Sequence, residues 1–172
     1  CPTTWSLTEE HCQKIPVNKG ENAIVVLTDY SQDIERDTHI LSTVVSNYKK
    51  IYFWCQGLLD HEYISKLGFA DKVEFVPPSL KGYRNILADQ SISLDYVGTR
   101  LHGGIFALQH FRRSILIGVD HRANEMGKDL NLPVIDRYVN SLDIENKILL
   151  DLELNICLPQ EKINLWKNQF NV

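Results

Sequence analysis

An arginine and a histidine stand one residue apart in the stretch DYVGTRLHGGIFALQ, which covers residues 95–109. Arg100 can bind a carboxylate or a phosphate through its planar fork of N–H donors. His102, with an ordinary pKa of about 6.5, can accept or donate a proton near neutral pH. The pair follows a short apolar run, in a place where neither side chain would help to build a core. The two residue types together suit acid–base chemistry on an anionic ligand.

A second histidine and arginine, His121 and Arg122, follow the apolar run 114–119. An isolated arginine or histidine is more often solvated or hydrogen bonded than functional. Because the two types occur together twice, each time after a predicted strand, an anion site and an ordinary structural role are about equally favoured. A helix that begins at Gly103 or Gly104 would add free N–H groups and a positive dipole end to the same space. The two glycines would also let the backbone approach a ligand closely.

The elements that must position these residues alternate along the chain. Apolar runs predict strands, and the longer amphipathic segments between them predict helices. The runs are continuous, which is typical of a mainly parallel sheet covered by helices on both faces. We therefore expect one doubly wound, Rossmann-like α/β domain of about six strands. The predicted strands are 23–28, 51–55, 73–76, 95–98, 114–119 and 133–135, and the predicted helices between them are 33–50, 61–68, 80–90, 104–111 and 122–131.

Ligands of such sheets collect beyond the carboxyl ends of the strands, where the strand order reverses. Both arginine–histidine pairs follow predicted strands, so we expect them at one edge of the sheet. Asp29 and Asp33 lie at the same edge, either as functional carboxylates or as helix caps, and capping is favoured. Arg112 and Arg113 come before the fifth strand, at the opposite edge, and are predicted to be cationic helix ends.

The length of 172 residues suits one well-buried domain. We divide the chain into an irregular N-terminal approach over 1–22, a Rossmann-like domain over 23–140, and C-terminal helices over 141–172 that pack on it. One short helix is expected in the approach, near 8–14.

Composition excludes several classes of function. A net charge of -4 argues against a broad electrostatic surface for nucleic acid or anionic lipid. No apolar run approaches the ~20 residues that span a bilayer. The four cysteines show neither a CxxC pair nor zinc-ligand spacing. No metal or other cofactor is therefore expected, and reduced thiols are favoured over the alternative of a disulfide between Cys1 and Cys12.

Several stretches resemble the polysaccharide pyruvyl transferase family. They are CPTTWSLTEEHC, TDYSQD, YFWCQG and, above all, DYVGTRLHGGIFALQHFRRSILIGVDHRANEMGKDLNLP. The resemblance runs from Cys1 to about Arg137 and is weaker beyond. Members of the family are similar in fold to two-domain GT-B glycosyltransferases, and they transfer a pyruvyl group from phosphoenolpyruvate to two sugar hydroxyls as a ketal. The resemblance implies a cytoplasmic bacterial transferase of exopolysaccharide or capsule biosynthesis, with a peripheral place at the membrane if its acceptor is lipid-linked.

The resemblance also implies roles for particular residues. The family's Arg-x-His motif falls on Arg100 and His102, so that Arg100 binds the donor's phosphate or carboxylate and His102 is the acid/base group. A basic residue after the next strand, commonly lysine in the family, falls on Arg122. Because an arginine is a poor proton donor at pH 7, His102 or His121 would have to move the proton. The remaining residues expected to bind the donor are Thr99, Leu101, Gly103, Gly104 and His121.

A two-domain enzyme of this kind needs a partner domain. We expect this chain to be the C-terminal, donor-binding half, with an N-terminal domain outside it, and to bind donor weakly and turn over little by itself. One alternative is a GT-B sugar-nucleotide glycosyltransferase, with a diphosphate on Arg100 and Arg122. The other is a non-catalytic module that binds an anion or a sugar.

Overall fold

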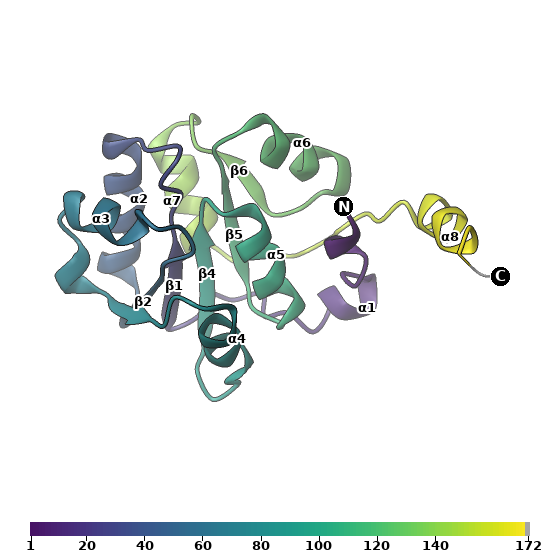
Figure 1. Cartoon of the computed structure of the whole chain (residues 1–172), viewed down its shortest axis with the longest axis horizontal. Helices are drawn as coiled ribbons and strands as arrows, with labels where there is room; N and C mark the ends of the chain where they lie inside the picture. The colour runs from purple at the N-terminus through teal and green to yellow at the C-terminus, as the bar shows by residue number, and fades with distance from the viewer. Residues whose placement is uncertain (171–172) are drawn as a thin grey trace.

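A parallel sheet of six strands lies at the centre of the protein (Figure 1), in a computed structural model that describes residues 1–170. The strand order is β3-β2-β1-β4-β5-β6, so the chain builds outward from β1 in one direction and then outward from β4 in the other. This order confirms the predicted doubly wound, Rossmann-like fold. The strands are β1 (Asn22–Val26), β2 (Lys50–Trp54), β3 (Glu74–Val76), β4 (Leu94–Gly98), β5 (Ser114–Gly118) and β6 (Val134–Asp136).

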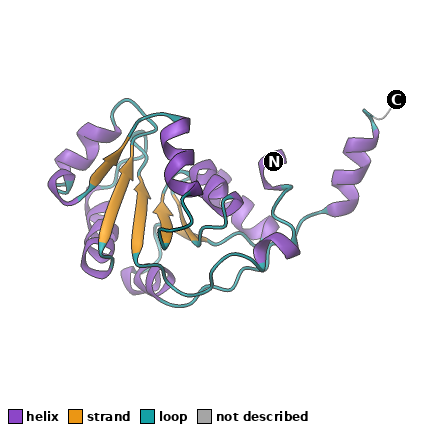
Figure 2. Ribbon diagram, turned by 90° about the horizontal axis from the view of Figure 1, so that it is seen from below, coloured by secondary structure: helices purple, strands orange, loops and turns teal. Residues whose placement is uncertain are grey.

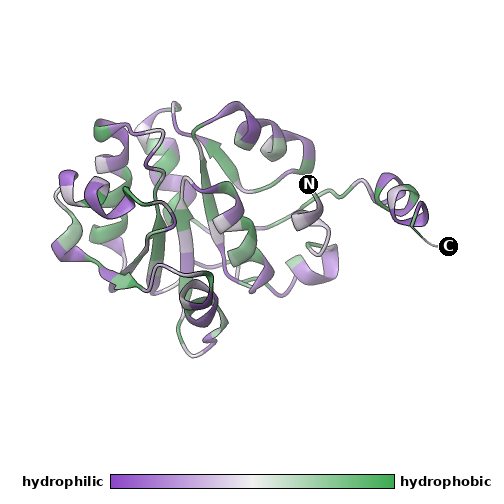
Figure 3. Cartoon of the chain, in the orientation of Figure 1, coloured by the Kyte–Doolittle hydropathy of each residue, from purple (hydrophilic) through white to green (hydrophobic). Residues whose placement is uncertain are grey.

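Helices cover both faces of the sheet (Figure 2), as the continuous apolar runs predicted. Neighbouring residues of a strand point to opposite faces, so Val25 packs in the core beneath α2, α3 and α7, and Val26 packs in the core beneath α4, α5 and α6. Figure 3 shows these hydrophobic strands between helices with hydrophilic outer sides. The helices are η1 (Pro2–Thr4), α1 (Glu9–Cys12), α2 (Ile34–Asn47), α3 (Asp60–Lys66), η2 (Ala70–Lys72), α4 (Leu80–Ala88), α5 (Leu101–Gln109), α6 (His121–Leu130), α7 (Ser141–Leu149) and α8 (Gln160–Asn168).

Helix α5 begins at Leu101, two to three residues earlier than predicted. Gly104 is therefore buried inside the helix and does not face a ligand across a turn. A Cβ atom at Gly104 would lie 2.7 Å from Leu116 Cγ and 2.8 Å from Tyr96 Cε1. This glycine lets α5 pack closely on β4 and β5, which corrects the prediction that it opens the backbone to a ligand.

The arginines before β5 lie at the opposite edge of the sheet, but they are buried and do not end their own helix in solvent. Arg112 Nε donates to Leu87 O at 2.8 Å, at the end of α4. Arg113 Nη1 donates to Asp95 Oδ2 at 2.7 Å, and its Nη2 donates to Ile148 O at 3.0 Å, at the end of α7. The prediction of helix-end cations is thus corrected, because both arginines bind the carboxyl ends of other helices from inside the protein.

The N-terminal segment contacts helix α8 away from the sheet. The predicted short helix of the N-terminal approach is confirmed as α1. Helix α7 packs beside α2 on the sheet, whereas α8 lies at the end of an extended segment away from it (Figure 1). Trp166 of α8 packs edge-on against Trp5, with ring centroids 5.0 Å apart. Of the two C-terminal helices, α7 thus lies on the sheet domain, and α8 packs on the N-terminal segment.

The cysteines carry free thiols, in agreement with the favoured prediction. Cys1 and Cys12 are both free, and Cys12 is buried whereas Cys1 is exposed. None of the helices between residues 1 and 170 has the length and apolar character needed to cross a bilayer.

Candidate functional site

The loops after four strands converge on a cavity of about 810 Å³ at the carboxyl edge of the sheet. The strand order reverses between β1 and β4, and the cavity lies beside this reversal, where a doubly wound sheet binds its ligands. The predicted meeting of the two arginine–histidine pairs at one edge is therefore confirmed. The cavity is lined by Tyr30, Gln56, Arg100, Leu101, His102, Asp120, His121 and Arg122.

The amino end of α5 has no side-chain cap, in contrast to that of α6. Arg100 occupies the N-cap position of α5 in an extended conformation, without a side-chain hydrogen bond to the first turn. At α6, by comparison, Asp120 accepts the N–H of Ala123 at 2.8 Å. A side chain of β4 holds the turn before α5, since the Tyr96 hydroxyl donates to Arg100 O at 2.7 Å. The first N–H groups of α5, together with its positive dipole end, remain available to an anion.

Two carboxylates hold the Arg100 side chain. Its Nη2 donates to Asp29 Oδ1 at 2.9 Å and to Asp60 Oδ1 at 2.7 Å, and its Nε donates to Leu27 O at 3.2 Å. Asp60 is fully buried, and its second oxygen accepts two backbone N–H groups of the loop after β2. Among the residues that the structure describes, Nη1 of Arg100 has no partner. A ligand could therefore accept a hydrogen bond from Nη1 of Arg100. The predicted two-point contact with the guanidinium would require Nη2 to lose its bond to Asp29 or Asp60.

Asp29 does not cap a helix, so the favoured prediction for this residue is wrong. Its side chain pairs with Arg100 because the loop turns back across the sheet edge before α2 begins. Asp33 is the cap of α2, as predicted, and its Oδ1 accepts the N–H of Arg36 at 3.1 Å.

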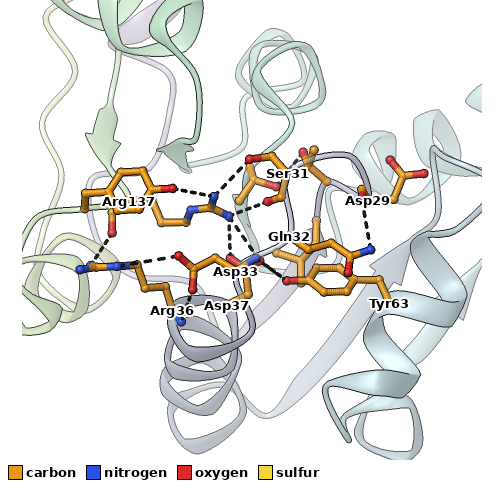
Figure 4. Close-up of polar contacts among 12 residues, drawn as sticks. Asp29, Ser31, Gln32, Asp33, Arg36, Asp37, Tyr63 and Arg137 are labelled. Carbon is orange, nitrogen blue, oxygen red and sulfur yellow. Dashed lines mark hydrogen bonds and ion pairs between the residues drawn. The ribbon is translucent and has the colours of Figure 1, made fainter.

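A buried ion pair anchors the loop that carries Asp29 (Figure 4). Arg137 Nη1 donates to Ser31 O at 2.8 Å and lies 3.4 Å from Asp37 Oδ2. Burial raises the pKa of Asp37, against the opposing effects of the Tyr63 hydroxyl and the Arg137 charge. The loop thus rests on β6 and α2 on one side, and its Asp29 meets Arg100 on the other.

His102 is exposed in the first turn of α5, at the wall of the cavity. Partial removal from water lowers its pKa from 6.5, and the positive charge of Arg122 lowers it further. The imidazole is therefore mainly neutral at pH 7. Arg122 has a 59% exposed side chain whose nearest carboxylate oxygen, Asp120 Oδ2, lies 3.4 Å away. An anion bound between Arg122 and α5 would favour the imidazolium form of His102.

The structure brings most of the predicted site residues together. Thr99 is an exception, because it is buried and its hydroxyl donates to the Thr28 hydroxyl at 2.9 Å. Gly103 lines a smaller cavity of about 220 Å³, which also borders His102. The predicted residues that line the large cavity are Arg100, Leu101, His102, His121 and Arg122.

Sequence reasoning missed Asp60, which decides how Arg100 is held. An aspartate next to a predicted helix is ordinarily interpreted as a cap. Its partner lies 40 residues away in sequence, and no local pattern connects the two.

No family model, curated protein or solved structure matches this chain. The resemblance to pyruvyl transferases accordingly stays a prediction. Within residues 1–170, no group of three or more His, Cys, Asp and Glu side chains is placed to hold a metal ion.

Proposed function

We propose that this domain is the donor-binding half of a polysaccharide pyruvyl transferase, acting on phosphoenolpyruvate and a saccharide in the bacterial cytoplasm. The observation that carries the proposal is the place of His102. A titratable imidazole stands at the uncapped end of α5, on the wall of a cavity that it shares with Arg122. A proton-transferring group beside an anion-binding surface is what this reaction needs.

The donor's phosphate, in this proposal, lies between Arg122 and the free N–H groups of α5. Each charge-assisted hydrogen bond contributes on the order of 1.5–3 kcal/mol, which gives an isolated domain micromolar to millimolar affinity. Arg122 stays charged and holds the phosphate, while the proton chemistry falls to His102. The side chain of Arg100 positions the cavity floor and adds at most one contact through Nη1, because its other nitrogens are engaged.

The chemical steps follow from these positions. The imidazolium of His102 protonates the methylene carbon of the donor, so that the central carbon becomes electrophilic. A sugar hydroxyl adds to that carbon, and its proton passes back to His102. The carbon–oxygen bond to the phosphate then breaks, a second hydroxyl of the sugar bonds to the same carbon and closes the ketal, and its proton leaves with the inorganic phosphate. Arg122 and the α5 N–H groups stabilise the departing phosphate.

Calorimetric titration of the chain with phosphoenolpyruvate and, separately, with UDP tests the proposal. We expect weak binding of phosphoenolpyruvate and no binding of UDP. Arg122→Gln should weaken phosphoenolpyruvate binding by about tenfold, the equivalent of ~1.4 kcal/mol. Arg84→Gln is the matched control, since Arg84 is an exposed arginine of α4 outside both cavities. His102→Gln should retain binding and lose phosphate release from phosphoenolpyruvate with an acceptor.

Other outcomes decide between the alternatives. UDP binding that is lost in Arg122→Gln would favour a sugar-nucleotide glycosyltransferase, with the diphosphate on Arg122 and Arg100. Binding of sulfate or a saccharide, with neither donor bound, would favour a non-catalytic module. Phosphate release at the normal rate in His102→Gln would show that the imidazole is not the acid/base group.

A further inference from the structure

A thiol lies against the imidazole of the candidate site. Cys1 Sγ is 3.5 Å from His102 Nε2, within hydrogen-bond reach for sulfur, and 3.0 Å from the Thr3 hydroxyl. The N-terminal segment is held there by Gln109 of α5, whose amide donates to Thr3 O at 2.6 Å. The contact of Gln109 with Thr3 therefore holds the N-terminal segment so that the Cys1 thiol lies beside His102.

The surroundings of Cys1 offer a base that can take its thiol proton. His102 is mainly neutral at pH 7, since partial desolvation and the charge of Arg122 lower its pKa, and a neutral imidazole can accept a proton. The charge of Arg122 and the open amino end of α5 both stabilise a nearby anion. The Thr3 hydroxyl is free to donate to the sulfur.

The other cysteines lack this combination. Burial raises the pKa of the Cys12 and Cys55 thiols, so they form less thiolate. Cys157 is exposed like Cys1, but among residues 1–170 its sulfur has a hydrogen bond only to Asn155 O, at 3.7 Å, and none to a histidine. Cys157 is thus an internal reference for an exposed thiol without activation.

We propose that Cys1 and His102 form a nucleophilic thiol–imidazole pair, directed at small ligands that carry an electrophilic carbon next to an anionic group. His102 Nε2 takes the thiol proton, the sulfur electron pair forms a bond to the electrophilic carbon, and the leaving group departs with the electrons of the broken bond. The anionic group of the ligand is held by Arg122 and the amino end of α5. The proposal of this pair does not require phosphoenolpyruvate to be the donor. The pair gives the site a second reactive group.

Alkylation at pH 7 tests the pair, with iodoacetate as an anionic reagent and iodoacetamide as its neutral counterpart. In both reactions a carbon–sulfur bond forms and iodide leaves. The rates at Cys1 and Cys157 are read from the same sample by peptide mass spectrometry. An ordinary thiol, with a pKa of about 8.5, is only a few per cent thiolate at this pH. We therefore expect Cys1 to react with iodoacetamide about tenfold faster than Cys157, and its preference for iodoacetate to be greater still.

Two variants separate the contributions. His102→Gln removes the base and should bring the rate at Cys1 to within about twofold of Cys157. Arg122→Gln should remove the extra preference for iodoacetate. Both side chains are exposed, and a thermal melt confirms that each variant is folded.

Equal rates at Cys1 and Cys157 in the unaltered chain, or a rate at Cys1 that survives His102→Gln, would overturn the pair. An unchanged iodoacetate preference in Arg122→Gln would overturn the anionic class of ligand. Failure of phosphoenolpyruvate to bind would leave these rates as they are, so the two proposals fail separately.

Discussion

Asp60→Asn removes one charge from the floor of the cavity while keeping the shape of the side chain. In the native protein, Oδ1 lies 2.7 Å from Arg100 Nη2, and Oδ2 accepts the N–H groups of Gln56 at 2.8 Å and Gly57 at 2.6 Å. An amide has a single acceptor oxygen, so it can serve the guanidinium or the loop but not both. Whichever way it turns, its NH₂ group faces donors in a fully buried place.

The size of the effect follows from these contacts. A hydrogen bond to a charged group contributes about 1.5–3 kcal/mol, and a buried donor left without a partner costs about 1–3 kcal/mol. We expect Asp60→Asn to lower the free energy of unfolding by about 3 kcal/mol, a large part of the ~5–15 kcal/mol of an ordinary domain. Urea unfolding, followed by far-UV circular dichroism, measures the change.

Asp29→Asn is the matched control, because it removes the other carboxylate from the same guanidinium nitrogen. The Asp29 side chain is 17% exposed, whereas that of Asp60 is 0% exposed. The cost at Asp29 should therefore be about 1 kcal/mol or less. The freed Arg100 should also bind sulfate more tightly. Equal costs for the two variants, or a loss below about 1 kcal/mol at Asp60, would refute the account of Arg100 as a residue held by a buried carboxylate.

Further predictions concern the first turns of α5. Because desolvation and Arg122 lower the pKa of His102, its imidazole should titrate below 6.5 in an NMR pH series, and Arg122→Gln should raise that pKa. Sulfate favours the imidazolium and does not itself titrate here, so it should bind more tightly as pH falls through the His102 pKa, as measured by calorimetry. Gly104→Ala should cost about 1–3 kcal/mol in urea unfolding, since its Cβ would meet Leu116 and Tyr96 at under 3 Å.

The fold was predictable because its signal is local. Each run is long enough to mark a strand, and the four central strands β1, β2, β4 and β5 are buried on both faces, which keeps their runs mainly apolar. The end of α3 was predictable as well, since Gly68 adopts a left-handed φ of 76° that few other residues take. The start of α5 was not predictable, because Gly103 and Gly104 suggest a turn. Both lie within the helix, and Gly104 is a glycine because Leu116 of β5 and Tyr96 leave no room for a side chain, which is tertiary information.

The candidate site was predictable in its place and less so in its electrostatics. The rule for strand ends placed His102 and Arg122 correctly at the cavity, because it depends only on the order of elements. The partners of Arg100 come from the loops after β1 and β2, and the sequence does not show how far these loops extend over the carboxyl edge of the sheet. Asp29 and Asp60 reach Arg100 from distant parts of the chain, and composition could only show that acidic residues outnumber basic ones.

The division of charge at this edge has a functional consequence. Below the cavity, one guanidinium meets two carboxylates, so the floor carries a net negative charge and resists an anion that comes too deep. At the rim, Arg122 has a single carboxylate neighbour within residues 1–170, Asp120, at 3.4 Å, and together with the open end of α5 it can hold the same anion beside His102. The anionic part of a ligand should therefore stay at the rim, where the imidazole and the Cys1 thiol can reach the neighbouring carbon. Changes at Asp60 should then act mainly on stability, and changes at Arg122 mainly on binding, because opposite sides of the cavity perform these tasks.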